Sequence, residues 1–251
     1  MRPLSATIIT LNEERNIADC LASLDFVDEI IVVDSGSTDS TEAICRANPK
    51  VRFLSRDWSG YGVQKNCAAG YAANDWILNI DADERVSPEL RAAIITADPE
   101  RSPAFRMARE NYFGGRHIRH CGWYPDYTTR LYDRRRCAFN ERAVHESLVS
   151  PATPATLDGN LRHFTYDGVE DYLQRMLRYS GLAAEEMVRE GRRPGLASLF
   201  VKPAATFLRM YLVRKGFLER EAGLQLSLLY AVYTFCKYAR ARELLKGKQH
   251  V

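Results

Sequence analysis

Strand-like and helix-like patterns of hydrophobic residues alternate along the first 90 residues. Short apolar runs predict strands at 6–10, 29–33, 51–54 and 76–80. Between them, the spacing of apolar residues predicts helices at 17–24 and 64–73. The run at 29–33 is β-branched and unbroken, which is typical of a strand buried on both faces. Ser87 before Pro88 is typical of a helix start. This order predicts an α/β fold with a mostly parallel, doubly wound sheet.

Polar residues follow three of these predicted strands at the point where each strand ends. Open α/β sheets bind their ligands at the carboxyl ends of their strands. The sequence therefore predicts a ligand site built from the three clusters Thr10-Leu11-Asn12-Glu13, Asp34-Ser35-Gly36-Ser37 and Asp81-Ala82-Asp83.

The third cluster has the composition of a cation site. In an extended chain, residues two positions apart point the same way, so Asp81 and Asp83 are expected to converge on one hard cation. Such a cation can bridge phosphate oxygens and neutralise a departing diphosphate. The alternative is a solvated turn. The position of the pair beside two other polar strand ends favours the metal.

The second cluster also allows two interpretations. The Asp34 carboxylate can accept the imide N–H of a uracil ring, while small residues beside it let a base lie against the backbone. Alternatively, the segment is a helix-capping turn with Ser37 or Asp39 as the cap. Both can hold, since Asp34 and Asp39 are different residues.

The pattern becomes irregular from about 104 to 165, where Arg, Tyr, Gly and His are frequent. Polar residues on loops of this kind usually build binding surfaces, here expected for an acceptor. Arg130 suits carboxylates and phosphates, and Trp123 and Tyr124 can stack on sugar faces, although aromatics are as often core residues. Beyond Gly168 an amphipathic helix is predicted, followed by apolar helical stretches at about 196–214 and 221–243.

Charge is distributed unevenly along the 251 residues. Net charge is +3, yet residues 189–248 carry +9, so the remaining chain carries −6. Apolar helices edged by Lys and Arg fit an interfacial helix on an anionic membrane surface, while the alternative is ordinary helices packed on the catalytic domain. No run of 18 apolar residues is free of charge, so no spanning helix is expected.

The six cysteines form no C-x-x-C pair, which indicates reduced thiols in a cytoplasmic protein. The chain enters a strand-like stretch within a few residues of Met1, so no signal peptide is expected. The expected location is the cytoplasm, and the basic helices favour a peripheral position on the cytoplasmic face of a membrane.

Together these motifs resemble glycosyltransferase family 2, whose members have the GT-A fold and use nucleotide-diphosphate sugars. The family resemblance rests on Val33 to Asp39, Asp81-Ala82-Asp83 and the opening Thr10 to Glu13. Further strings are similar to the subgroup that adds glucose to the inner core of lipopolysaccharide: Asp57 to Gly62, Asn111-Tyr112-Phe113, Gly122 to Asp126, Val144 to Ser147 and Tyr233 to Tyr238.

The resemblance implies roles for individual residues. Glu146 occupies the place of the catalytic base, the alternative being a surface salt-bridge partner. Its neighbour makes the motif His-Glu rather than the commoner Glu-Asp. His163 stands where a histidine can complete the metal site with Asp83, the alternative being a structural histidine, and Mg²⁺ or Mn²⁺ is the implied cofactor. The nucleotide-binding residues implied are Thr10, Asn12, Glu13, Asp34, Ser35, Gly36 and Asp81.

The resemblance also implies a domain division and an activity. A GT-A catalytic domain is expected at 1–165, with a nucleotide-sugar half at about 1–100 and an acceptor half at about 101–165, and a helical, basic extension at 166–251. The implied reaction is an inverting transfer of a hexose, with glucose favoured, from a UDP-sugar to a lipid-linked lipopolysaccharide inner-core acceptor. The alternatives are transfer to another surface glycan and a metal-dependent phosphohydrolase. In phosphohydrolases that use Asp-x-Asp, the pair normally follows the first strand, whereas here it follows the fourth.

Overall fold

The fold was obtained as a computed structural model that describes residues 3–140 and 146–247. The chain divides into two compact units, which are described separately. The first comprises residues 1–109 and 126–163, and the second comprises 110–125 and 164–251. Residues 110–125 thus group with the C-terminal helices, whereas the expected domain boundary at 165 stays a prediction.

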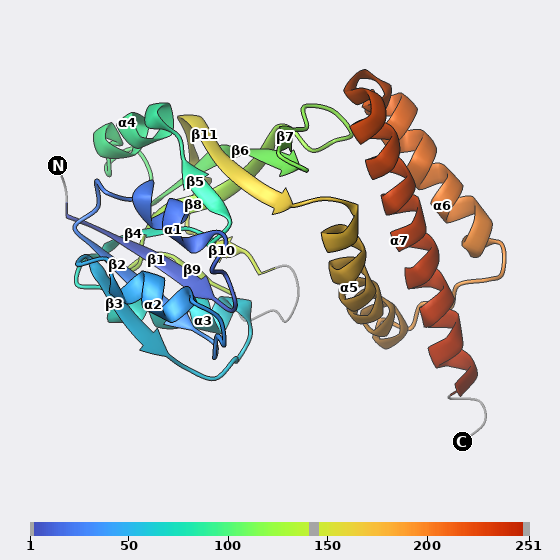
Figure 1. The fold of residues 1–251 in the computed structure, drawn as a ribbon, viewed down its shortest axis with the longest axis horizontal. Coiled ribbons are helices and arrows are strands. Elements are labelled where there is room, and N and C mark those ends of the chain that lie inside the picture. Colours follow the sequence, from blue (N-terminus) through green and yellow to red (C-terminus); the bar gives the residue numbers. More distant parts are fainter. Residues whose placement is uncertain (1–2, 141–145, 248–251) are drawn as a thin grey trace. The chain divides into compact units, whose positions relative to one another are not determined.

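The first unit begins with a parallel sheet in which helices connect neighbouring strands (Figure 1). Its strand order is β3-β2-β1-β4, and Thr10 pairs with Asp34 where β1 and β2 end. The four predicted strands are confirmed, as are the helices between them. Their bounds are β1 Leu4–Thr10, α1 Ile17–Ala22, β2 Glu29–Asp34, α2 Thr41–Arg46, β3 Val51–Ser55, α3 Tyr61–Tyr71 and β4 Trp76–Asn79.

Beyond β4 the sheet continues with antiparallel pairings. Strand β8 pairs with β4, β6 pairs with β8, and β11 pairs with β5, each antiparallel. Parallel pairing thus holds for the first four strands. The added elements are β5 Glu84–Val86, α4 Pro88–Thr96, β6 Ala104–Phe113, β7 Arg116–His117, β8 Asp126–Asp133 and β11 Ala155–Tyr166, with a separate hairpin of β9 Ala138–Phe139 and β10 Leu148–Val149.

The core of this unit lies on both faces of the parallel strands. Ile30 and Val32 belong to the cluster that includes α1 residues, whereas Ile31 and Val33 belong to the cluster with Ala68 of α3. All four β2 side chains have no exposed area. Burying each is worth roughly 1.5–3 kcal/mol, so the unbroken β-branched run is explained by helices packed on both sides.

The start of α4 also follows the sequence. The Ser87 side chain accepts a hydrogen bond from the Leu90 N–H at 3.2 Å, and Pro88 is the first helical residue. Proline fits there because its missing N–H has no partner inside the helix anyway. The predicted cap is confirmed.

The second unit is a helical bundle. Its helices are α5 Val169–Arg189, α6 Ser198–Leu208 with a π turn η1 at Arg209–Val213, the 3₁₀ turn η2 Gly216–Glu219, and α7 Arg220–Gly247. Helix α7 packs against both α5 and α6. Among the described residues, no helix is both long and apolar enough to cross a membrane. The helices expected from the sequence are confirmed.

Candidate active site

The loops after β1 and β2 are joined to each other by hydrogen bonds. The Asn12 N–H donates to Ser37 Oγ at 2.8 Å, and the Asn12 side-chain oxygen accepts the Thr38 N–H at 2.8 Å. Asn12 has a φ of 56°, a left-handed conformation that asparagine tolerates better than most residues. Two of the three polar clusters therefore form one connected edge.

Asp34 organises this edge. Its carboxylate is buried and accepts hydrogen bonds from the Thr10 hydroxyl at 2.9 Å, from the Gly36 and Ser37 N–H groups at 2.9 and 2.8 Å, and from the Ser37 hydroxyl. A carboxylate offers about four acceptor positions, so these donors account for much of its capacity. Asp34 thus holds the turn; its contact with a uracil ring stays a prediction.

The N-cap residue of α2 is Ser40, whose side chain makes no capping hydrogen bond, so neither Ser37 nor Asp39 is the cap; Asp39 instead binds the first residue of the helix. Asp39 Oδ1 accepts the N–H of Thr41, the first residue of α2, at 3.0 Å and the Thr41 hydroxyl at 2.6 Å. Thr41 Oγ1 in turn accepts the Glu13 N–H at 2.8 Å. The start of α2 is therefore fastened to the loop after β1.

Ser35 and Gly36 were also predicted from the sequence to bind the nucleotide, and both lie on this edge. The Ser35 hydroxyl accepts a hydrogen bond from Gln64 of α3 at 3.1 Å. Gly36 has a φ of +91°, and a Cβ built on it would meet no atom within 4 Å. Glycine is therefore required there by the backbone conformation rather than by crowding.

The Asp81-Ala82-Asp83 segment has a different geometry from the expected one. Its chain is not extended, because a turn closes it with the Glu84 N–H donating to the Asp81 carbonyl at 2.9 Å. The two carboxylates consequently have separate partners. Asp81 meets Lys65 Nζ at 3.1 Å and Arg130, whereas Asp83 Oδ2 lies 3.4 Å from His163 Nε2. The expectation that both point the same way as in a strand is corrected.

Two cations surround Asp81. Burial would raise the pKa of its carboxyl, but the charges of Arg130 and Lys65 outweigh burial and hold that pKa well below its usual range. Arg130 also contacts Glu84, whose side chain is fully buried, at 2.6 Å. Asp81 is therefore an ionised carboxylate within a compensated cluster.

Arg130 does not occupy the acceptor surface on which the sequence analysis placed it. Its side chain is only 4% exposed, and its guanidinium is engaged by Asp81, Glu84 and the Asn79 side chain. The strand register explains this position. Leu131 of β8 pairs with Leu78 of β4, and Arg130 is the residue of β8 just before that pair. Arg130 is therefore a buried partner of Asp81 and Glu84.

Lys65 joins two of the predicted site residues. It belongs to α3, its side chain is 3% exposed, and its Nζ lies 3.1 Å from Asp81 Oδ1 and 3.0 Å from Glu146 Oε1. Sequence reasoning missed Lys65 because a single lysine in a helix normally points to solvent. A signal was present, since residues 64, 65, 68 and 69 share one face of α3 and the last two are alanines.

The loop that carries Glu146 is anchored on α3 as well. Asn66 exchanges two hydrogen bonds with the Phe139 backbone of β9, at 2.8 and 2.9 Å. The Asn140 N–H then donates to the Ser147 carbonyl at 3.0 Å, one residue after Glu146. Glu146 is 19% exposed. Val144 and His145 of the same motif lie outside the described residues.

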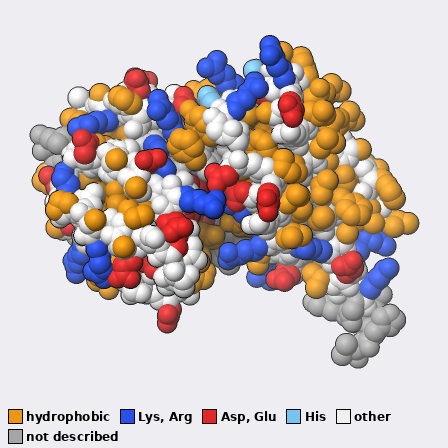
Figure 2. Space-filling model, viewed as in Figure 1, with side chains coloured by type: hydrophobic (Ala, Val, Ile, Leu, Met, Phe, Trp, Pro, Cys, Tyr) orange, Lys and Arg blue, Asp and Glu red, His pale blue; other side chains and the backbone are white. Residues whose placement is uncertain are grey.

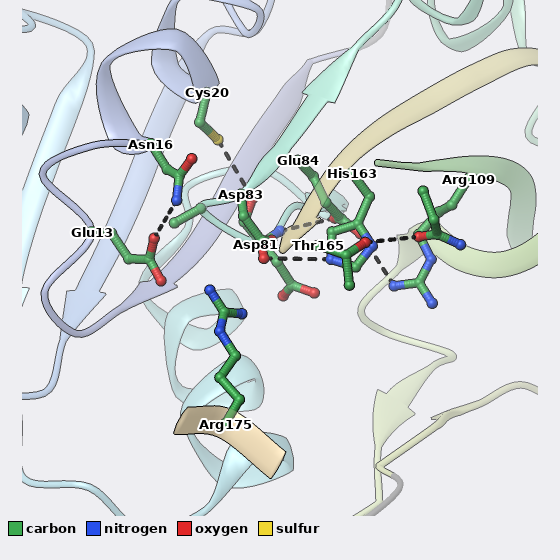
Figure 3. A network of polar contacts seen from close by, with 12 residues as sticks. Glu13, Asn16, Cys20, Asp81, Asp83, Glu84, Arg109, His163, Thr165 and Arg175 are labelled. Atoms are coloured by element: carbon green, nitrogen blue, oxygen red, sulfur yellow. Dashed lines mark hydrogen bonds and ion pairs between the residues drawn. The ribbon is translucent and has the colours of Figure 1, made fainter. Parts of the chain in front are cut away.

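His163 reaches the site from β11, where it pairs with Glu84 of β5. Figure 3 shows its ring directed at Asp83. Burial lowers the pKa of His163, but the hydrogen bond and charge of Asp83 outweigh burial and raise that pKa above its ordinary value. Residues 3–140 and 146–247 contain no group of three His, Cys, Asp or Glu side chains placed to hold a metal.

Arg109 and Asp126 extend this network and were also missed from the sequence. Arg109 Nη2 lies 2.6 Å from Asp126 Oδ2, and its Nη1 lies 3.5 Å from Glu84 Oε1. The two residues are opposite each other in the β6–β8 pairing. Glu84 therefore accepts from two arginines, which compensates its complete burial.

Trp123 and Tyr124 belong to the second unit. Trp123 is 8% exposed and packs among Phe113, Tyr166 and Tyr230, so the structure gives it the core position that was the alternative to sugar stacking. Tyr124 is 36% exposed and meets His117 edge-on, with ring centroids 5.4 Å apart.

Known proteins similar to this chain include a lipopolysaccharide core biosynthesis glycosyltransferase, LpsC, from Rhizobium meliloti. The two are 33% identical, and the alignment covers 99% of this chain and 96% of LpsC. An uncharacterized glycosyltransferase of Rickettsia prowazekii, RP128, is 28% identical over 100% of this chain and 90% of its own length.

Among solved structures, the chain is similar to the mannosyltransferase PcManGT from Pyrobaculum calidifontis, determined in complex with GDP-Man and Mn²⁺. The TM-score is 0.52 at 16% identity, with 96% of this chain and 87% of that chain covered. At this identity the likeness concerns the fold, and the expected GT-A fold is confirmed.

Residues 5–138 match Glycosyl transferase family 2. This span contains the three polar strand ends, Lys65 and Arg130, and the similarity to LpsC extends over nearly the whole chain. The protein is a glycosyltransferase, and the phosphohydrolase alternative is thereby set aside. The chain belongs to glycosyl transferase family 2.

Proposed function

We propose that this glycosyltransferase moves a hexose, with glucose as the favoured sugar, from a UDP-sugar to an inner-core lipopolysaccharide acceptor, with inversion at the anomeric carbon. The similarity to a lipopolysaccharide core glycosyltransferase over nearly the full chain supports the acceptor class. The reaction type rests on the residues of the first unit.

The observation that carries the proposal is the bridge made by Lys65. One buried ammonium contacts both Asp81, which follows a central strand, and Glu146, which comes from a loop 65 positions later in the sequence. A transferase needs its diphosphate site and its base on either side of one sugar-sized space. Lys65 fixes these two carboxylates relative to each other, and so acts as a positioning residue.

Glu146 is the proposed general base. It takes the proton of the acceptor hydroxyl while that oxygen bonds to the anomeric carbon and the bond to the UDP oxygen breaks. A single displacement of this kind inverts the anomeric configuration. A positioned base contributes about 10²–10⁴ in rate, which makes Glu146 the most sensitive residue of the site.

The donor nucleotide is assigned to the joined loops after β1 and β2, with Thr10, Asn12, Glu13, Asp34, Ser35 and Gly36 as its contacts and Asp81 on the diphosphate side. The hydrogen bonds between these loops support a preformed pocket. Small side chains at 35 and 36 leave backbone accessible to a flat base.

Asp83 and His163 are the proposed protein ligands of Mg²⁺ or Mn²⁺. Two ligands fit a cation that a substrate completes, because Mg²⁺ sites commonly combine one or two carboxylates with phosphate oxygens and water. The contact of Asp83 with His163 supports the pairing. When bound, the cation would stabilise negative charge on the leaving diphosphate.

The acceptor is proposed to be lipid-linked and met at the cytoplasmic face of the inner membrane. Tyr124 keeps an exposed ring that can pack on a sugar. Arg130 and Trp123 are buried, so their contributions to acceptor binding are indirect.

The test is a transfer assay with purified protein, UDP-glucose and Mn²⁺, using lipopolysaccharide from cells that lack this protein as acceptor. We expect UDP release that depends on that acceptor, a mass gain of one hexose, and an inverted anomeric centre by NMR. Transfer only to a capsular, exopolysaccharide or other lipid-linked acceptor would move the activity to another surface glycan, and transfer from UDP-galactose alone would change the sugar.

A further inference from the structure

The second unit carries a row of apolar side chains that protrude from α6 and the turns after it. The most exposed are Phe200 at 70%, Val201 at 61% and Val213 at 73%, while Leu208 and Leu212 are each at least half exposed. No residue of α6 is buried. Figure 2 shows hydrophobic side chains gathered over the C-terminal helices. Clusters of this kind are uncommon on a surface that faces only water.

Helical spacing places all of these side chains except that of Val213 on one face. Residues 200, 201, 204, 205, 208 and 212 recur at intervals of about one turn, and all of them are exposed. The opposite side of the same segment carries Thr206, whose hydroxyl lies 3.2 Å from that of Thr234 on α7, and the buried Met210. Packing on α7 therefore accounts for one side of α6 and leaves the other apolar side uncovered within the described residues of this unit.

The charge of this segment indicates whether a second copy of the chain or an anionic surface covers the apolar face. Residues 191–218 contain six Lys or Arg and no Asp or Glu. Lys202, Arg209, Arg214 and Lys215 are exposed beside the apolar row. A second copy of the chain would bring like charges together, which disfavours self-association. An anionic surface would be attracted instead.

We propose that the face formed by α6, η1 and η2, here called the docking face, inserts its apolar side chains into an anionic phospholipid bilayer. An interfacial helix combines apolar side chains that enter the acyl boundary with basic side chains that meet the phosphate headgroups. Phe200, Leu208 and Val213 supply the first group, and Arg209 and Lys215 the second. This assignment does not depend on the proposed donor or acceptor, since it concerns only the second unit.

The experiment uses the full chain and vesicles without any sugar substrate. Cosedimentation is measured with vesicles of phosphatidylethanolamine and phosphatidylglycerol, and with vesicles of phosphatidylcholine alone. We expect binding to the anionic vesicles that falls by at least tenfold with phosphatidylcholine and weakens between low and high salt.

Variants separate the two contributions. The double variant Phe200→Ser and Val213→Ser should lower partitioning at least tenfold at every salt concentration, whereas Arg209→Glu with Lys215→Glu should lower it chiefly on anionic vesicles. Val149→Ser and Arg101→Glu, at exposed positions of the first unit, are the matched controls and should bind like the unchanged protein. Circular dichroism and thermal unfolding report whether each variant is folded.

Insertion is measured directly with Phe200→Trp. Its emission should shift to shorter wavelength on adding anionic vesicles and be quenched by brominated acyl chains. Two results would overturn the proposal: equal sedimentation of the unchanged protein and the Phe200→Ser, Val213→Ser variant, or a dimer in solution that this variant dissociates. If the unchanged protein transfers sugar but does not bind vesicles, this inference fails and the proposed function stands. If it binds vesicles but does not transfer sugar, the proposed function fails and this inference stands.

Discussion

Lys65 Nζ lies 3.0 Å from Glu146 Oε1, although the two residues are 81 positions apart in the sequence. The same ammonium lies 3.1 Å from Asp81 Oδ1. A side chain only 3% exposed thus serves two carboxylates from different parts of the chain. A buried lysine is costly unless it is paired, so its presence indicates that the arrangement of these carboxylates is worth maintaining.

Replacing Lys65 with methionine should slow transfer mainly through kcat. The hydrophobic stem is retained, while the ammonium that orients Glu146 is lost. We expect a smaller loss than removal of the proposed base would cause, which is about 10²–10⁴ in rate. Steady-state kinetics with UDP-glucose measure kcat and KM separately. Lys65→Arg should recover part of kcat because it restores a cation. If kcat stays low in Lys65→Arg and thermal stability falls as well, Lys65 has a purely structural role.

Glu146→Gln should suppress transfer while leaving donor binding intact. The amide keeps the size of the side chain but cannot accept the proton of the acceptor hydroxyl, so kcat should fall by about 10²–10⁴. Calorimetric titration with UDP should give an unchanged Kd. The matched control Glu100→Gln alters an exposed residue between α4 and β6. Full transfer by Glu146→Gln would assign the base to another residue.

Asp83→Asn should weaken the response to metal. The carboxylate is the stronger of the two proposed ligands, and even residues that only orient a ligand change metal affinity by about 10–100-fold. Manganese binding in the presence of UDP, followed by electron paramagnetic resonance, gives a readout independent of turnover. Chelator should abolish transfer by the unchanged protein. The control Asp158→Asn, at an exposed position on the same strand as His163, should bind manganese like the unchanged protein. Unchanged manganese binding by Asp83→Asn would mean that another group holds the metal.

Arg130→Met should destabilise the fold. It removes the arginine that contacts both carboxylates, so that Glu84, which has no exposed area, keeps only Arg109 at 3.5 Å and Asp81 keeps only Lys65 at 3.1 Å. Breaking a buried ion pair from one side costs about 3–5 kcal/mol, and urea unfolding measures the difference. Adding Glu84→Leu to the variant should recover part of the stability. Arg101→Met, on an exposed loop, should change it by less than about 0.5 kcal/mol. If Arg130→Met impaired only acceptor binding at full stability, the original acceptor role would stand.

The sequence predicted the parallel strands well because each is marked by local features. An unbroken β-branched run has no stable position except between two layers, and Ser87 with Pro88 specifies a helix start through backbone hydrogen bonds alone. The polar strand ends could be grouped for the same reason, since parallel strands end at one edge.

The partners of these residues could not be predicted in the same way. Lys65 meets Glu146 only because the β9–β10 hairpin is fastened to α3 through Asn66. The geometry of Asp81 and Asp83 depended on a turn closed by Glu84, which a strand register does not anticipate. Trp123 and Arg130 were assigned by residue type, whereas burial decided their positions.

The hydrogen bonds between Asn12 and the Ser37–Thr38 segment have a consequence for the proposed donor site. Because each loop is the other's scaffold, neither has to become ordered when a nucleotide arrives, and little conformational entropy is lost on binding. Because of these hydrogen bonds, the two loops also depend on each other when either sequence changes. A substitution in one loop would move the other, so a change of base specificity at the proposed donor site would require paired changes after β1 and β2.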